Sequence, residues 1–109
     1  MQQRFGCSGQ QVSAIGQGSW MMENASPLAA VAALQRGIEL GLTHIDTAEM
    51  YGNGETELLV GEALRGLRER VFLVSKAYPQ HADAAGLKRA CDASRRRLQL
   101  DSIDLYLLH

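Results

Sequence analysis

Hydrophobic and polar residues alternate along this chain with two different periods. Three stretches place apolar residues three and four positions apart, which is the spacing of one face of an α-helix. Between them lie short runs rich in branched and aromatic residues, bounded by glycine and polar residues, which are typical of buried strands. The pattern therefore predicts alternating strands and helices. They are led by a small hairpin with a turn at Ser8 and Gly9 that feeds a strand around residues 12–15.

The predicted helices cover residues 27–40, 55–67 and 83–100. The first has the clearest ends, because Ser26 suits an N-cap, Pro27 suits the first helical position and Gly41 follows the last turn. Asp83 is a plausible cap for the third helix. The residues expected on the apolar faces, helix by helix, are Leu28, Val31, Leu34 and Ile38, then Leu58, Val60, Ala63, Leu64 and Leu67, then Leu87, Ala90, Cys91, Ser94 and Leu98.

Three further strands are predicted at residues 42–46, 71–76 and 102–109. Strands that alternate with amphipathic helices indicate a parallel sheet with right-handed crossovers. An open doubly wound sheet and part of a (β/α)8 barrel both fit this order. The first strand–helix junction has no G-x-G-x-x-G sequence, so a Rossmann dinucleotide loop is not supported.

Composition narrows the function classes only slightly. The chain has 109 residues, 46% hydrophobic and 21% charged, and a net charge of −1, as in one ordinary globular domain. This balance predicts neither a nucleic-acid partner nor a membrane partner. Cys7 and Cys91 lack metal-type or redox-type spacing, so no metal site is expected, and reduced thiols favour a cytoplasmic protein. No apolar run approaches the ~18 residues of a membrane span.

Ionisable residues end three of the predicted strands. Asp46, Lys76 and His109 stand at the carboxyl tips, and Tyr51 follows in the loop after Asp46. Adjacent strands lie ~4.8 Å apart, so these side chains can converge within about 10 Å at the edge where α/β proteins place their sites. A carboxylate can hold a lysine, and an ammonium stabilises a phenolate relative to a phenol. With an imidazole to orient a carbonyl, the set suits proton donation to a carbonyl oxygen that gains negative charge.

Each of these residues also has a simpler interpretation. An aspartate at a strand end is often a helix cap, Lys76 can be a solvated strand terminus, and Tyr51 can be a loop aromatic. His109 can be a frayed end, while His44 suits the interior and His81 a surface loop. A small α/β binding module whose strand-end residues are structural therefore remains an alternative. The joint arrangement of the four residues favours a catalytic site.

At this point the sequence resembles a known family, the aldo-keto reductases. The carrying segments are "GLTHIDTAEMYG" (41–52), "FLVSK" (72–76) and "SIDLYLLH" (102–109), in the family's order, with "VSAIGQGSW" (12–20) similar to its first strand and loop. The likeness covers essentially the whole chain. Among subgroups it is most similar to bacterial reductases of methylglyoxal and diketo-gluconate.

The resemblance implies a (β/α)8 barrel that reduces small aldehydes and ketones with NADPH and without a Rossmann domain. It implies that Tyr51 is the general acid, that Lys76 activates it, that Asp46 pairs with Lys76 and that His109 orients the carbonyl. By the same resemblance Gly18, Ser19, Trp20 and Asp46 bind the cofactor, while Trp20, Tyr51 and His109 line the substrate pocket.

A complete barrel of this kind needs roughly 250 residues. We therefore expect residues 1–109 to be the N-terminal half of such a barrel, with about four parallel strands, three connecting helices and the hairpin, and with the C-terminal half absent. The isolated chain is expected to be inactive, because the loops that grip the cofactor's phosphates come later in the family. One alternative is a non-catalytic half-barrel that associates with itself through unpaired edges, as a scaffold or binding module. Another is a pair of copies that complete a barrel-like assembly.

Overall fold

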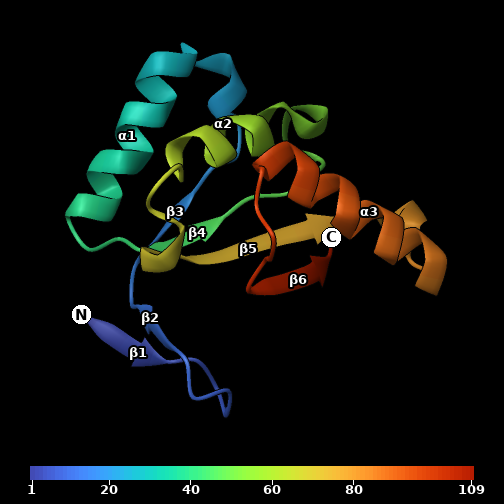
Figure 1. The fold of residues 1–109 in the computed structure, drawn as a ribbon, viewed down its shortest axis with the longest axis horizontal. Coiled ribbons are helices and arrows are strands. Elements are labelled where there is room, and N and C mark those ends of the chain that lie inside the picture. Colours follow the sequence, from blue (N-terminus) through green and yellow to red (C-terminus); the bar gives the residue numbers. More distant parts are fainter.

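The structure, a computed structural model, describes residues 1–109 and contains a two-stranded hairpin, a four-stranded sheet and three α-helices (Figure 1). The strands are β1 (Gln2–Arg4), β2 (Gln11–Ser13), β3 (Gly16–Gly18), β4 (His44–Asp46), β5 (Phe72–Ala77) and β6 (Leu105–Leu108). The helices are α1 (Pro27–Glu39), α2 (Glu55–Ala63) and α3 (Ala84–Leu98), joined by the short 3₁₀ helices η1 (Met22–Asn24), η2 (Tyr51–Gly54), η3 (Arg68–Arg70) and η4 (Pro79–His81). None of the helices combines the length and the hydrophobicity that a membrane span requires.

The four-stranded sheet is parallel throughout, in the order β3-β4-β5-β6. Its register pairs Gly18 with Asp46, Asp46 with Val74, and Lys76 with Leu107. The carboxyl ends of all four strands therefore lie at one edge. The predicted hairpin, the three connecting helices and the four parallel strands are all present.

The position predicted for the first parallel strand is wrong. Residues Gln11–Ser13 form the second strand of the hairpin, and β3 at Gly16–Gly18 joins the parallel sheet instead. At Gly16 a Cβ would lie 2.8 Å from the carbonyl oxygen of His44, so the close approach of β3 to β4 needs glycine there. The Gln17 amide donates to the carbonyl oxygens of Leu34 and Leu42, at 3.1 and 2.9 Å. These contacts are tertiary, and a Gly-Gln-Gly segment shows no local strand propensity.

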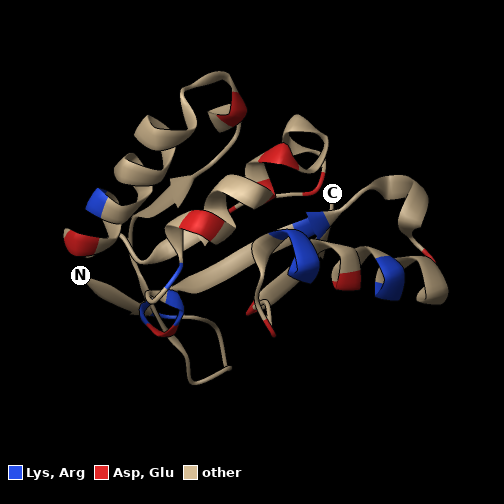
Figure 2. Cartoon of the chain, turned by 45° about the horizontal axis from the view of Figure 1, so that its top comes forward, with Lys and Arg blue, Asp and Glu red and all other residues tan.

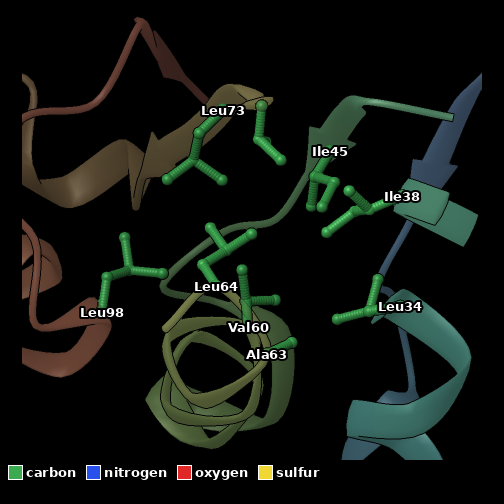
Figure 3. Close-up of a cluster of buried hydrophobic side chains, with 9 residues drawn as sticks. Leu34, Ile38, Ile45, Val60, Ala63, Leu64, Leu73 and Leu98 are labelled. Atoms are coloured by element: carbon green, nitrogen blue, oxygen red, sulfur yellow. The ribbon is translucent and has the colours of Figure 1, made fainter. Parts of the chain in front are cut away.

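The three helices cover one face of the sheet, and the core lies between the two layers (Figures 1 and 3). Figure 3 shows side chains from α1, α2, β4 and β5 pointing toward one another in this layer. Each such buried Leu, Ile or Val side chain contributes about 1.5–3 kcal/mol relative to exposure. The core consists of Leu34, Ile38, Ile45, Val60, Ala63, Leu64, Val71, Leu73 and Leu98.

Helix α1 forms where it is predicted, because local signals mark both of its ends. The Ser26 hydroxyl accepts the Ala29 amide at 3.2 Å, and Gly41 adopts a positive φ of 93° after the last turn. Two residues expected on apolar faces are nevertheless exposed: Leu28 by 83% and Leu58 by 45%. Leu58 is exposed because α2 packs through Gly61 instead, where a Cβ would lie 2.5 Å from the Leu98 carbonyl oxygen. This glycine face, rather than Leu58, lies against α3.

The other helix boundaries and one strand face also differ from expectation. Helix α2 ends at Ala63 rather than at residue 67, and Gly66 in the following turn has a φ of 75°. Two-residue spacing along a strand would place Ile103 on the same face as Leu105. Ile103 precedes β6 instead and packs on the helix side, whereas Leu105 packs with Val74 on the opposite face. The hairpin covers part of that opposite face, which we call the inner face, through Val12 against Phe72 and Val74.

Candidate active site

The four strand-end residues of interest lie together at the carboxyl edge of the parallel sheet. Asp46 ends β4, Lys76 lies near the end of β5, and Tyr51 begins η2 in the loop after β4. His109 directly follows β6, and its backbone amide donates to the Ala77 carbonyl oxygen at 2.9 Å, so the ladder between β5 and β6 extends to it. The parallel register therefore brings together residues that are up to 63 positions apart (109 − 46).

Lys76 is the centre of the arrangement. Its Nζ donates to Asp46 Oδ2 at 2.7 Å, to the Thr47 carbonyl oxygen at 2.9 Å and to Tyr51 Oη at 3.2 Å. The Lys76 side chain is only 15% exposed, and the Asp46 side chain is 39% exposed. Three oxygen partners compensate for the burial of the ammonium group and fix it in place.

Tyr51 faces both Lys76 and His109. Its hydroxyl lies 3.5 Å from Asp46 Oδ2, at the limit of hydrogen-bond distance, and its ring centroid lies 4.9 Å from Lys76 Nζ. The His109 ring meets the Tyr51 ring edge to face, with centroids 5.8 Å apart. An open cavity of about 400 Å³ adjoins this pair, and it is lined by Trp20, Met50, Tyr51, Gly52 and His109. The site thus combines a phenol, an ammonium, a carboxylate and an imidazole beside a largely apolar hollow.

The end of β3 and the loop that follows it supply the three remaining residues predicted for the site. Gly18 pairs with Asp46 in the sheet, and a Cβ there would meet nothing within 4 Å. Ser19 is fully buried, and its hydroxyl donates to the Asp46 carbonyl oxygen at 2.8 Å. Trp20 lies beside the cavity with 71% of its surface exposed. Sequence reasoning missed Met50 and Gly52, whose only signal is their position on either side of Tyr51.

A buried polar network behind the site was also missed by sequence reasoning. Glu57 of α2 is fully buried and accepts from Ser75 Oγ at 2.9 Å and from Arg97 Nε at 2.8 Å. Glu57 lies on α2 and Arg97 on α3, and Figure 2 colours the acidic and basic positions along the chain. Glu49, also buried, accepts from the Tyr78 amide at 2.6 Å and contacts His81 Nδ1 at 2.8 Å. The network joins the loop that carries Tyr51 to the segment after Lys76.

Comparisons with known proteins agree with this arrangement. The model of the aldo/keto reductase family matches residues 14–109. Methylglyoxal reductase YeaE from Escherichia coli is 62% identical over 98 residues, which are 88% of this chain and 34% of that protein. The uncharacterized oxidoreductase Rv2298 from Mycobacterium tuberculosis is 40% identical over 107 residues, covering 91% of this chain and 33% of that protein.

Solved structures agree as well. The crystal structure of an aldo/keto reductase from Klebsiella pneumoniae in complex with NADP and acetate is 55% identical, with a TM-score of 0.88 over 93% of this chain and 36% of that one. The thermostable aldo-keto reductase Tm1743 is 37% identical, with a TM-score of 0.94 over all of this chain and 42% of that one. These likenesses confirm the expected fold class, an α/β arrangement that is the N-terminal part of a (β/α)8 barrel. The chain spans about a third of the length of the curated relatives it matches.

Proposed function

Because the chain belongs to the aldo/keto reductase family, we propose that it carries the catalytic centre of an NADPH-dependent reductase of small aldehydes and ketones. In this proposal Asp46, Tyr51, Lys76 and His109 are the catalytic residues. Residues 1–109 are the N-terminal half of the barrel. Methylglyoxal is the first substrate to test, because a relative 62% identical over 98 residues is a methylglyoxal reductase.

One observation supports the proposal most directly. Lys76 Nζ lies within hydrogen-bond distance of both Asp46 Oδ2 and Tyr51 Oη, at 2.7 and 3.2 Å. A solvated strand terminus would not bury its ammonium group among three oxygen atoms. A carboxylate, an ammonium and a phenol in sequence form a relay that can stabilise negative charge on the phenol oxygen. General acid catalysis by a phenol needs that stabilisation.

The residues around the cavity suit a nicotinamide ring. Trp20 offers an exposed aromatic surface beside the hollow, and the Asp46 side chain, 3.5 Å from the Tyr51 hydroxyl, retains 39% exposure. We propose that Trp20 and Asp46 hold the nicotinamide end, with Gly18 and Ser19 shaping the loop beneath it. When bound, NADPH supplies the hydride that reduces the carbonyl carbon. Two crystal structures of an aldo/keto reductase from Klebsiella pneumoniae, 55% identical to this chain, contain NADP and NADPH.

The chain's own residues then handle the proton. As the carbonyl oxygen gains negative charge, the Tyr51 hydroxyl donates its proton to that oxygen, and the product is an alcohol. The Lys76 ammonium, held by Asp46, stabilises the phenolate that remains. His109, whose ring lies against the Tyr51 ring, donates a hydrogen bond that orients the carbonyl oxygen toward Tyr51. Trp20 and Met50 supply apolar surface beside this point.

We propose that the 109-residue chain alone is inactive. The cavity lining contains no lysine or arginine, and Lys76 is committed to Asp46. The phosphates of a dinucleotide therefore find no cationic partner at the cavity. We propose that the cationic partners of the phosphates belong to the part of the barrel that lies outside the third of the relatives' length matched by this chain.

A chimera tests this function. Residues 1–109 would replace the matching segment of the Escherichia coli methylglyoxal reductase, which is similar enough for the barrel to close. We expect the chimera to oxidise NADPH in step with methylglyoxal reduction and the 109-residue chain to show no turnover. A chimera that folds and binds NADPH but leaves methylglyoxal and other small carbonyls unreduced would contradict the proposal.

A further inference from the structure

Trp20 is held by its neighbours in the chain rather than by packing of its own ring. The indole is 71% exposed. On one side, Ser19 is buried and bonded to the Asp46 carbonyl oxygen through both its hydroxyl and its amide, at 2.8 and 3.1 Å. On the other side, Met21 adopts a left-handed conformation with a φ of 68°, which is uncommon for a residue with a side chain. Neither the exposed indole nor Met21 fixes the position of this loop, so a contact further along the chain must do so.

Glu23 provides that anchor. It lies in η1, three residues after Trp20, and its Oε2 accepts the hydroxyl of Thr56 at 2.7 Å. Thr56 is fully buried in the first turn of α2. The N-cap of α2 is Gly54, which has no capping side chain. The carboxylate of Glu23 is thus an acidic group from 33 residues away that is placed favourably at the positive end of this helix.

The stem of Glu23 also lies on the loop that carries Tyr51. A Cβ at Gly52 would lie 2.8 Å from Glu23 Cγ and 3.0 Å from its Cδ. Because Gly52 has no side chain, the Glu23 side chain can occupy the space beside it. Since Gly52 directly follows Tyr51 and lines the same cavity as Trp20, one side chain spans the gap between the Trp20 loop and the Tyr51 loop.

We propose that Glu23 is a positioning residue that sets where Trp20 stands relative to Tyr51 across the cavity. Its catalytic meaning rests on the proposed function, because Trp20 and Tyr51 form two walls of the pocket that would receive the carbonyl. Glu23 itself does not line the cavity and touches no reacting atom. It acts through the hydrogen bond to Thr56 and the contact with Gly52.

The test uses the 109-residue chain without cofactor or substrate. Hydrogen exchange is measured at the backbone amides of Met22 and Asn24, which donate to the carbonyl oxygens of Ser19 and Met21. Trp20 is the only tryptophan, so time-resolved fluorescence anisotropy reports on this loop and separates its local motion from the tumbling of the whole chain. The variants are Glu23→Ala, Thr56→Val, the combination of these two, and Glu23→Gln. Glu39→Ala is the matched control, because Glu39 is exposed and pairs only with Arg36.

We expect Glu23→Ala and Thr56→Val each to raise exchange in η1 at least roughly tenfold, the least that loss of a hydrogen bond to a carboxylate implies. Both substitutions should also lower the anisotropy of Trp20. The double variant should show nearly the same exchange and anisotropy as either single variant, because both substitutions remove the same hydrogen bond. Glu23→Gln keeps an acceptor oxygen and stays within about threefold of the parent. Glu39→Ala changes neither readout.

The proposal is overturned if Glu23→Ala leaves exchange and anisotropy at the parent values. It is also overturned if exchange rises equally in α1, because the residue would then support the fold in general. Turnover and cofactor play no part in these readouts, so failure here leaves the proposed function standing. An inactive chimera, conversely, leaves this result standing.

Discussion

The three tyrosines of this chain are the same side chain in three different environments. The Tyr51 hydroxyl accepts from the Lys76 ammonium at 3.2 Å beside an open cavity. The Tyr78 hydroxyl donates to Asn53 Oδ1 at 2.9 Å on the surface. The Tyr106 hydroxyl is buried without a hydrogen-bond partner. Burial, followed by the nearby Glu49 carboxylate, raises the pKa of Tyr106 to about 12. The environment, and not the residue type, separates a candidate general acid from a structural phenol.

Alkaline titration tests this assignment for Tyr106. The phenolate is disfavoured in the fold, so the folded chain holds a proton that the unfolded chain releases near pH 10. The stability from this group is therefore fully present below pH 10 and is lost as the pH rises toward about 12. We expect one tyrosine to ionise near pH 12 by ultraviolet absorbance and Tyr106→Phe to remove that step. If the step survives the substitution, the environment described for Tyr106 is wrong.

At the scale of elements, the sequence predicts what local signals determine. The span of α1 follows from Ser26, Pro27 and Gly41, and the convergence of Asp46 with Lys76 follows from strand ends in a parallel sheet. The position of β3 could not be predicted, because its glycines and Gln17 serve contacts with β4 and α1 that only the folded sheet creates. Residues at the ends of paired strands can therefore be placed from the sequence. A strand that forms through tertiary contacts, against its local propensity, cannot be placed in this way.

The contact between α2 and α3 shows the same limit. Apolar periodicity places Leu58 inside, yet the face of α2 that meets α3 carries Gly61 and the buried Glu57. Glu57 is acceptable there only because Arg97 and Ser75 satisfy its two oxygens. A single glutamate in a helix sequence gives no sign of such partners.

This pairing predicts a large effect of one substitution. Arg97→Met leaves the Glu57 carboxylate buried without its cation, so we expect a loss of about 3 kcal/mol in the free energy of unfolding. Adding Glu57→Gln should recover part of that loss, since the buried charge is gone. Arg96→Met, at an exposed position one residue away, is the control. Urea unfolding gives these values. Equal effects of Arg97→Met and Arg96→Met would show that the pair contributes no more than a surface charge.

At the scale of the whole molecule, the structure presents four parallel strands with β3 and β6 at the sheet edges. Apolar side chains are exposed near both edges, including Ile15 by 69% and Leu108 by 56%. Edges of this kind promote pairing with other chains, so self-association of the isolated chain stays a prediction. The chain spans about a third of its curated relatives, and the proposed division of labour follows. In that proposal residues 1–109 supply the proton donor and the nicotinamide end of the cofactor site, and the part of the barrel outside the matched third holds the phosphates.

The measurement that tests the central claim most directly is the turnover of the chimera with Tyr51→Phe, set against Tyr78→Phe. We expect Tyr51→Phe to lower kcat at least about a hundredfold, the smallest effect usual for a positioned general acid. Affinity for NADPH should stay unchanged, because the ring remains. Tyr78→Phe removes a hydroxyl that bonds only Asn53 and should keep near-parent turnover. If Tyr51→Phe retains normal kcat, Tyr51 is not the proton donor and the assignment of Asp46, Lys76 and His109 around it fails as well.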